Sequence, residues 1–220
     1  MSTGLLFVTA PEADYKLINR ILLRLRAWNN DYIFDSFKLV TTKNAYDLEP
    51  PVHSERNRLP ATSPTLSEAS LDNAWAGASL EDVEAFCLDV HRAAPFRYVE
   101  TTQFLLVDSE ALHAAESVIG CRRGKFTEEE DFFFLDEFDK MRIPQDQVFS
   151  PWANFELGNM QFWEFTQEEQ DWGLDEWGEL NRVRQDGWFT YRQIADNPMT
   201  EEQSRYKEEQ MAWFEGEGWI

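Results

Sequence analysis

Acidic residues alternate with apolar ones between residues 131 and 139, and their carboxylates are the side chains of this sequence best suited to catalysis or metal binding. The carboxylates are those of Asp131, Asp136, Glu137 and Asp139. If the stretch is a strand, Asp131 and Glu137 share a face with Asp139, because alternate residues point to the same side. Converging carboxylates can bind Mg²⁺ or Ca²⁺, or act as general acid and base. A solvated acidic face is the competing interpretation, and the acidity of the whole chain favours it.

The histidines and cysteines form no recognisable catalytic motif. A dyad of Cys121 with His91 would have to be assembled by the fold, since catalytic partners meet in space and not along the chain. His53 lies in a polar stretch, and Cys87 falls on the apolar stripe of an expected helix, where a buried inert thiol is typical. Glycine-rich nucleotide loops, a nucleophile elbow and zinc-protease motifs are missing from the sequence. We therefore predict no catalytic residue, no metal ligand set and no cofactor.

Tryptophan is concentrated after residue 126, together with most of the excess of acidic over basic residues. A sugar or planar cation could stack on Trp152 and Trp163 beside the carboxylate of Glu164. Filling of the core or of an interface is the competing role of large aromatic side chains. Asn154 and Asn159 flank a turn-like Gly158, so their amides could face a ligand or bind the local backbone.

Two further tryptophans, Trp213 and Trp219, are surrounded by acidic residues and glycines, which is typical of a docking segment. The candidate residues for contact with a ligand or partner are thus Trp152, Asn154, Asn159, Glu164, Trp213 and Trp219.

Composition narrows the classes of partner. The 220 residues carry a net charge of −21, yet 43% of them are hydrophobic, so the chain can bury a core. The negative charge should repel nucleic acids and anionic membranes, and it favours a basic protein partner. Two isolated cysteines, no signal peptide and no apolar run long enough to span a membrane lead us to expect a cytoplasmic protein.

Hydrophobic periodicity predicts the elements that must position these residues. Helical spacing occurs over residues 12–28, from a possible capping box at Ser79 to about Pro95, and over 200–214. Strands are expected for residues 5–8, 33–40 and 103–107, with a short helix at 110–117. The run at 132–138 fits either type, and we favour a strand because the following residues also look extended.

The expected fold is a single α/β domain with a central mixed sheet of about four to six strands, flanked by helices and interrupted by a long flexible insertion. Residues 1–42 would supply a strand-helix-strand unit, and residues 43–78 a flexible Pro- and Ser-rich linker. A partner-binding or phosphorylated role for that linker is the alternative. Residues 79–191 would form an α/β core, and residues 192–220 an acidic helix with an aromatic tail.

Several short runs carry a resemblance to a known family. Phe104 to Asp108 reads FLLVD, Met141 to Pro144 reads MRIP, Asn154 to Phe165 reads NFELGNMQFWEF, and Asp186 to Phe189 reads DGWF. In these runs the stretch from about Leu80 to Tyr191 resembles an uncharacterised family of small acidic intracellular domains from actinobacteria and fungi. Members carry LLFVAD-like, FRVVP-like, NLSLANMDFEEFA-like and DGVFRG-like segments in the same order. The resemblance implies an α/β domain, and it implies no activity.

For function, we expect a non-catalytic interaction module that contacts a basic protein through its acidic, tryptophan-rich surface. A carboxylate-based hydrolase, with or without a divalent metal, is the alternative from a different class. A small-ligand module centred on Trp152 and Glu164 is the third interpretation.

Overall fold

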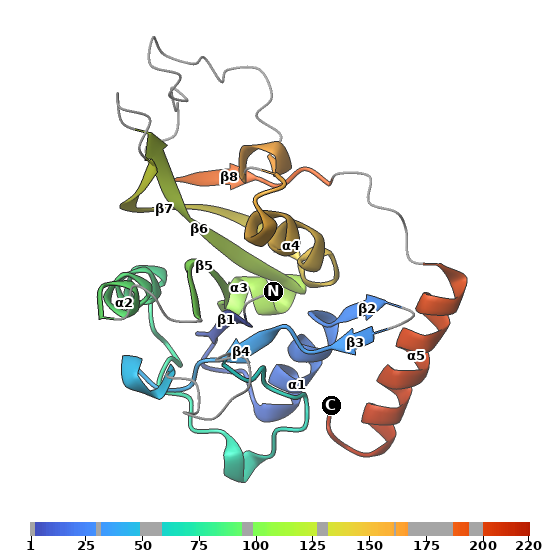
Figure 1. Ribbon diagram of the computed structural model, residues 1–220. Coiled ribbons are helices and arrows are strands. Elements are labelled where there is room, and N and C mark those ends of the chain that lie inside the picture. Colours follow the sequence, from blue (N-terminus) through green and yellow to red (C-terminus); the bar gives the residue numbers. More distant parts are fainter. Residues whose placement is uncertain are drawn as a thin grey trace.

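Six strands form a mixed sheet at the centre of the structure, with helices on both of its faces (Figure 1). The computed structural model describes residues 3–29, 32–48, 59–93, 99–126, 132–160, 162–166, 187–193 and 200–220. The sheet strands are β1 Thr3–Val8, β4 Phe37–Leu39, β5 Val99–Val107, β6 Glu116–Phe126, β7 Phe132–Pro144 and β8 Trp188–Thr190, in the order β4-β1-β5-β6-β7-β8. The predicted α/β class, with a mixed sheet of four to six strands, is confirmed.

Helices and a small ribbon surround this sheet. A separate two-stranded ribbon pairs β2 Ala27–Asn29 with β3 Tyr32–Phe34. The helices are α1 Tyr15–Arg24, α2 Leu80–Ala93, α3 Ser109–Ala114, α4 Phe149–Leu157 and α5 Glu201–Gly216, with 3-10 helices η1 Ala45–Leu48, η2 Glu68–Ser70, η3 Gln145–Gln147 and η4 Phe162–Phe165. Of the helices in the described ranges, none is long and apolar enough to cross a membrane.

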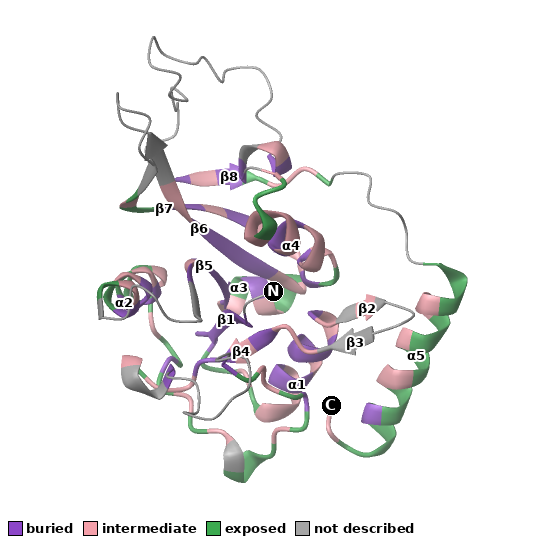
Figure 2. Ribbon diagram, viewed as in Figure 1, coloured by how far each residue is buried: buried purple, intermediate pink, exposed green. Residues whose placement is uncertain are grey.

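One half of the sheet is parallel. β1 runs between β4 and β5, and all of its residues are buried, as expected for a strand covered on both faces (Figure 2). Leu6 and Val8 join the hydrophobic cluster that contains α1, whereas Leu5 and Phe7 join the cluster that contains α2. The two helices therefore cover opposite faces of the same strand.

The other half is built on an antiparallel meander of β5, β6 and β7, with β8 added parallel to β7 at the edge. The prediction of a strand at 132–138 is confirmed. The pairing of β6 with β7 is irregular, because Arg122 faces Phe138 but Gly124 faces Phe134. β7 therefore has a bulge between these two pairs, and the bulge carries two of the candidate carboxylates.

Two of the expected elements differ in their bounds. The predicted helix over 12–28 is shorter, because α1 begins only after Asp14, whose side chain accepts a hydrogen bond from the Leu17 amide and caps the helix. The expected strand at 33–40 is divided between β3 and β4, which lie in different sheets.

The described parts of the segment predicted as a linker lie against the core. Residues 49–58 are outside the described residues, but Leu48, Leu59 and Trp75 are buried in the cluster on the α2 side of the sheet. The amide of Thr62 donates to the Phe37 carbonyl of β4 at 2.8 Å. Few apolar residues are needed to hold this segment, because Trp75 alone buries a large area. At least residues 59–78 thus belong to the packed fold.

Candidate functional site

Trp152 lies in the core, although the sequence analysis named it as a possible ligand contact. Its ring is 2% exposed and meets Phe37 of β4 edge to face, with ring centroids 5.0 Å apart. A Cβ atom at Gly4 would come within 2.4 Å of Trp152 Cζ2, so the ring occupies the space above that glycine. Enclosed in this way, the indole has no face left on which a ligand could stack.

Asn154 and Asn159, the two asparagines beside the turn-like Gly158, lie at the C-terminal end of helix α4. Asn154 Nδ2 donates to the Ser150 carbonyl one turn earlier, at 2.9 Å. Gly158 ends α4 with φ +65°, and the Asn159 amide donates to the Asn154 carbonyl. This is the hydrogen-bond pattern that closes helix ends. Asn154 therefore bonds local backbone, and the exposed Asn159 side chain lies beyond the helix.

Glu164 lies in η4, near the edge strand of the sheet. Its carbonyl accepts a hydrogen bond from Arg192 Nη2 at 3.0 Å, and its side chain is half-buried. The side chain of Trp163 is outside the described residues, so the expected sandwich of two tryptophans and a carboxylate has no described counterpart.

The candidate carboxylates of β7 are paired with arginines. Arg123 contacts both Glu137 and Asp139, which shows that these two carboxylates share a face, as their spacing predicted. Asp136 points to the other face of the sheet, and the hydrogen bond from Arg92 lowers its pKa below the ordinary value. Asp131 is outside the described residues.

This arrangement does not favour acid-base catalysis. A general acid needs a carboxyl group whose pKa is raised toward neutrality, and arginine partners act in the opposite direction. Within the described ranges, no three His, Cys, Asp or Glu side chains gather as a metal site would require.

The side chains that could act as nucleophiles, Cys87 and Ser109, are not arranged for catalysis either. Cys87 is fully buried, and burial raises the pKa of its thiol. Glu12 lies between Ser109 and His113, because Ser109 Oγ donates to Glu12 Oε2 at 2.9 Å and His113 Nε2 is 3.6 Å from Glu12 Oε1. Serine hydrolases instead need the imidazole next to the hydroxyl, with the carboxylate behind it.

The carboxyl ends of β1 and β4 are covered by a turn at residues 73–77. The Gly77 amide donates to the Thr9 carbonyl at 2.8 Å, and the Ala74 amide donates to the Thr41 carbonyl at 2.9 Å. Open α/β sheets usually bind ligands at the carboxyl ends of their parallel strands. Here the chain's own backbone occupies those positions after β1 and β4.

The C-terminal helix α5 offers a different kind of surface. Thr200 and Gln203 form a capping box at its start, and Glu201 and Glu202 in the first turn suit the positive end of the helix dipole. The helix predicted over residues 200–214 is confirmed. In Figure 1 α5 lies beside β2 and β3, and in Figure 2 most of its outward side is exposed.

A few contacts attach α5 to the rest of the molecule. Phe214 is buried, with the Arg26 guanidinium 5.5 Å from its ring centroid, and Tyr206 meets Trp28 edge to face. Within the described ranges, these contacts all lie along one side of α5.

The tail after α5 is fixed by a buried amide. Asn19 of α1 is fully buried and donates from Nδ2 to the carbonyls of Trp219 and Leu66, at 2.8 and 2.9 Å. Its Oδ1 accepts from the Leu66 amide. Of the two tryptophans predicted as contacts near the C-terminus, Trp219 is therefore anchored through its backbone carbonyl, and its side chain is half-buried.

One flank of α5, next to the side that contacts Trp28, presents aromatic and acidic side chains together. Trp213 is 51% exposed and Tyr206, whose ring also contacts Trp28, is 40% exposed, and both lie on the flank that carries Glu202 and Glu209. We call Glu202, Tyr206, Glu209 and Trp213 the outer stripe, because they follow one another at helical intervals of four, three and four residues. The sequence analysis missed Tyr206, although its spacing of seven residues from Trp213 could have indicated a shared face.

Comparison with known proteins adds no relative: no family model, no curated protein and no solved structure matches this chain.

Proposed function

We propose that this protein is a non-catalytic interaction module, and that the outer stripe of α5 binds a basic segment of a partner protein. The observation that supports this most is that Trp213 is half-exposed, although the next residue, Phe214, is buried against Arg26 and holds the helix in place. Tryptophan and tyrosine are enriched among the residues that dominate binding energy at interfaces. The surrounding glutamates add charge without covering the rings.

The chemistry of the stripe favours arginine on the partner. A guanidinium can stack on an aromatic face and bind a carboxylate with two parallel hydrogen bonds, whereas an ammonium acts as a point charge. Glu209 lies one turn before Trp213, so one arginine side chain could use both groups. The net charge of −21 would speed the approach of such a partner and would repel nucleic acids and anionic membranes. Cys87 and Cys121 are both buried and neither forms a disulfide, which supports a reducing, cytoplasmic setting.

A peptide titration tests this proposal. Fluorescein-labelled nona-arginine is titrated with the protein at 0.05 and 0.15 M NaCl, and nona-lysine is titrated in parallel. Trp213→Ala should weaken nona-arginine binding by about 1–2 kcal/mol, roughly five- to thirtyfold, because an interface anchor is lost. Glu209→Gln should weaken it less, and nona-lysine should bind more weakly than nona-arginine.

The matched control is Glu81→Gln on α2, which removes the same charge from an exposed site distant in sequence from the stripe. If Glu209→Gln and Glu81→Gln reduce binding equally and Trp213→Ala leaves it unchanged, the net charge alone attracts the peptide and the outer stripe is not the site. If the wild-type protein does not bind nona-arginine even at 0.05 M NaCl, the proposal fails.

A further inference from the structure

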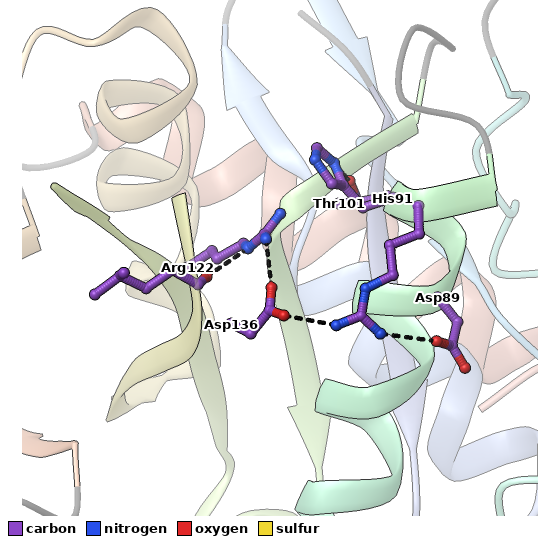
Figure 3. Close-up of polar contacts among 7 residues, drawn as sticks. Asp89, His91, Thr101, Arg122 and Asp136 are labelled. Atoms are coloured by element: carbon purple, nitrogen blue, oxygen red, sulfur yellow. Dashed lines mark hydrogen bonds and ion pairs between the residues drawn. The ribbon is translucent and has the colours of Figure 1, made fainter. Parts of the chain in front are cut away.

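Two arginines from different elements hold one carboxylate on the α2 side of the sheet. Arg122 Nη2 of β6 is 2.7 Å from Asp136 Oδ1, and Arg92 Nη2 of α2 is 2.6 Å from Asp136 Oδ2. Figure 3 shows Asp136 between Arg122 and the end of α2, where Asp89 also points toward the cluster. The two guanidinium groups are therefore set for an anionic group that lies between them.

Arg122 is rigidly positioned and keeps a spare donor. Its side chain is only 7% exposed, and its Nε donates to the Leu135 carbonyl in the bulge at 2.6 Å. The ring of Phe134 lies 5.7 Å from the guanidinium carbon. Nη1 is buried and has no hydrogen-bond acceptor within the described part of the chain. A buried donor without an acceptor is costly, so it commonly marks a functional position.

Asp136, by contrast, can leave without disturbing the core. Its side chain is 53% exposed and lies in the bulge of β7, where strand pairing is already interrupted. Arg92 is also mostly exposed, so it can follow a new partner. The cluster thus combines one fixed arginine, one adaptable arginine and one replaceable carboxylate.

We propose that Arg92 and Arg122 form a receptor for a phosphate group, either inorganic phosphate or a phosphate monoester, and that Asp136 occupies this receptor in its absence. A dianionic phosphate has more charge and more acceptor oxygens than the carboxylate that it replaces, so it can engage both arginines and the spare Nη1 donor. A partner carboxylate would only exchange one equivalent group for another. The proposal does not depend on the outer stripe of α5.

The long-range charge of the protein weakens phosphate binding but does not prevent it. Exposed charges are screened beyond about 8 Å at physiological ionic strength. In the wild-type chain, Asp136 competes with phosphate for the two arginines. The apparent affinity for phosphate is reduced by the fraction of molecules in which Asp136 occupies the receptor.

Removal of the competing carboxylate gives the sharpest test. Binding of inorganic phosphate is measured by calorimetry and by the melting temperature, against sodium chloride at equal ionic strength. Asp136→Asn should bind phosphate about tenfold more tightly than wild type, because the internal competitor is lost. The double variant Asp136→Asn with Arg92→Gln should lose this gain.

Glu137→Gln is the matched control, since Glu137 pairs with Arg123 on the opposite face, and it should not change phosphate affinity. If Asp136→Asn binds phosphate no better than wild type, or if its gain survives Arg92→Gln, the receptor does not exist. Should Asp136→Asn fold poorly, the side-chain Nε–Hε signals of Arg92 and Arg122 in the wild-type protein provide a second readout. Absence of any shift of these signals up to 50 mM phosphate overturns the proposal.

A phosphoserine peptide and its unmodified form distinguish the two sources of phosphate. Tighter binding of the phosphopeptide than of inorganic phosphate supports the proposal with a modified protein as the source. Equal binding of phosphopeptide and phosphate supports it with the free ion as the source. Equal binding of both peptides, modified and unmodified, contradicts it.

Discussion

Two glycines of the sheet leave room for aromatic rings. Gly120 of β6 pairs with Phe104 of β5, and a Cβ atom at Gly120 would come within 2.3 Å of the Phe104 ring. Gly4 gives Trp152 room in the same way. At both positions an aromatic ring lies across the glycine, which packs the sheet without a gap.

Gly120→Ala should therefore destabilise the fold by about 1–3 kcal/mol, because the ring of Phe104 must move within a packed core. Urea unfolding followed by tryptophan fluorescence measures this loss. Gly216→Ala in α5 is the control, since nothing lies within 4 Å of a Cβ atom there, and it should be neutral or stabilise by up to about 1 kcal/mol. Equal losses in the two variants would show that Phe104 adapts freely.

Asp108 should make stability depend on pH. Burial alone would raise its pKa, but hydrogen bonds from Arg142 and from the Ala111 amide prevail and hold the pKa below the ordinary value. A carboxyl group with a lowered folded-state pKa stabilises the fold above its unfolded pKa of about 4, and this contribution is lost as the pH falls through the folded value.

We expect Asp108→Asn to lower stability at pH 7 and to flatten the fall in unfolding free energy below about pH 4. Urea titrations between pH 7 and pH 2.5 measure both effects. An unchanged slope in the acid range would mean that Asp108 titrates alike in the folded and unfolded chains.

At the scale of elements, α5 depends on its cap because the described contacts that hold it lie along one side. Thr200→Ala removes the capping box and should lower the stability of the helix by about 1 kcal/mol. Hydrogen exchange should accelerate in the first turns of α5, with protection in β1 and β5 unchanged. Ser204→Ala, which leaves the box intact, serves as the control. Acceleration throughout the sheet would show that α5 and the core unfold together.

Sequence patterns predicted the elements whose signals are local. The capping box predicted at Ser79 is present as two hydrogen bonds with Asp82, and β7 follows the alternation of its residues. Helix α4 was not predicted, although Pro151 in its first turn is compatible with a helix. Proline is tolerated in a first turn, where no helical acceptor exists for its nitrogen.

The candidate site was predictable only in part, because some of its features depend on neighbours along the chain and others on residues far away in the sequence. Exposure of Trp213 follows from its acidic neighbours along one helix, whereas burial of Trp152 depends on Gly4 and Phe37, more than a hundred residues earlier in the chain. The pairing of Arg92 with Asp136 likewise requires the fold to bring α2 next to the bulge of β7. Contacts of this range leave no periodic pattern in a sequence.

For the molecule as a whole, net charge should limit stability at low ionic strength. A charge of −21 repels itself, and raising the salt concentration from 0.01 to 0.1 M shortens the Debye length from about 30 to about 10 Å. We expect the melting temperature at pH 7 to rise over this range. A fall would mean that ion pairs such as Arg142 with Asp108 outweigh the repulsion among unpaired carboxylates.

The buried amide of Asn19 has a consequence for the way the chain is made. Its hydrogen bond to Trp219 spans 200 residues, so on the ribosome Asn19 must wait for that length of chain before this second Nδ2 hydrogen bond can form, whereas the bond to Leu66 can form earlier. At about 5–20 residues per second, that delay is of the order of ten seconds or longer. During this time one Nδ2 hydrogen of Asn19 needs water or a chaperone as its acceptor, until the Trp219 carbonyl takes that place.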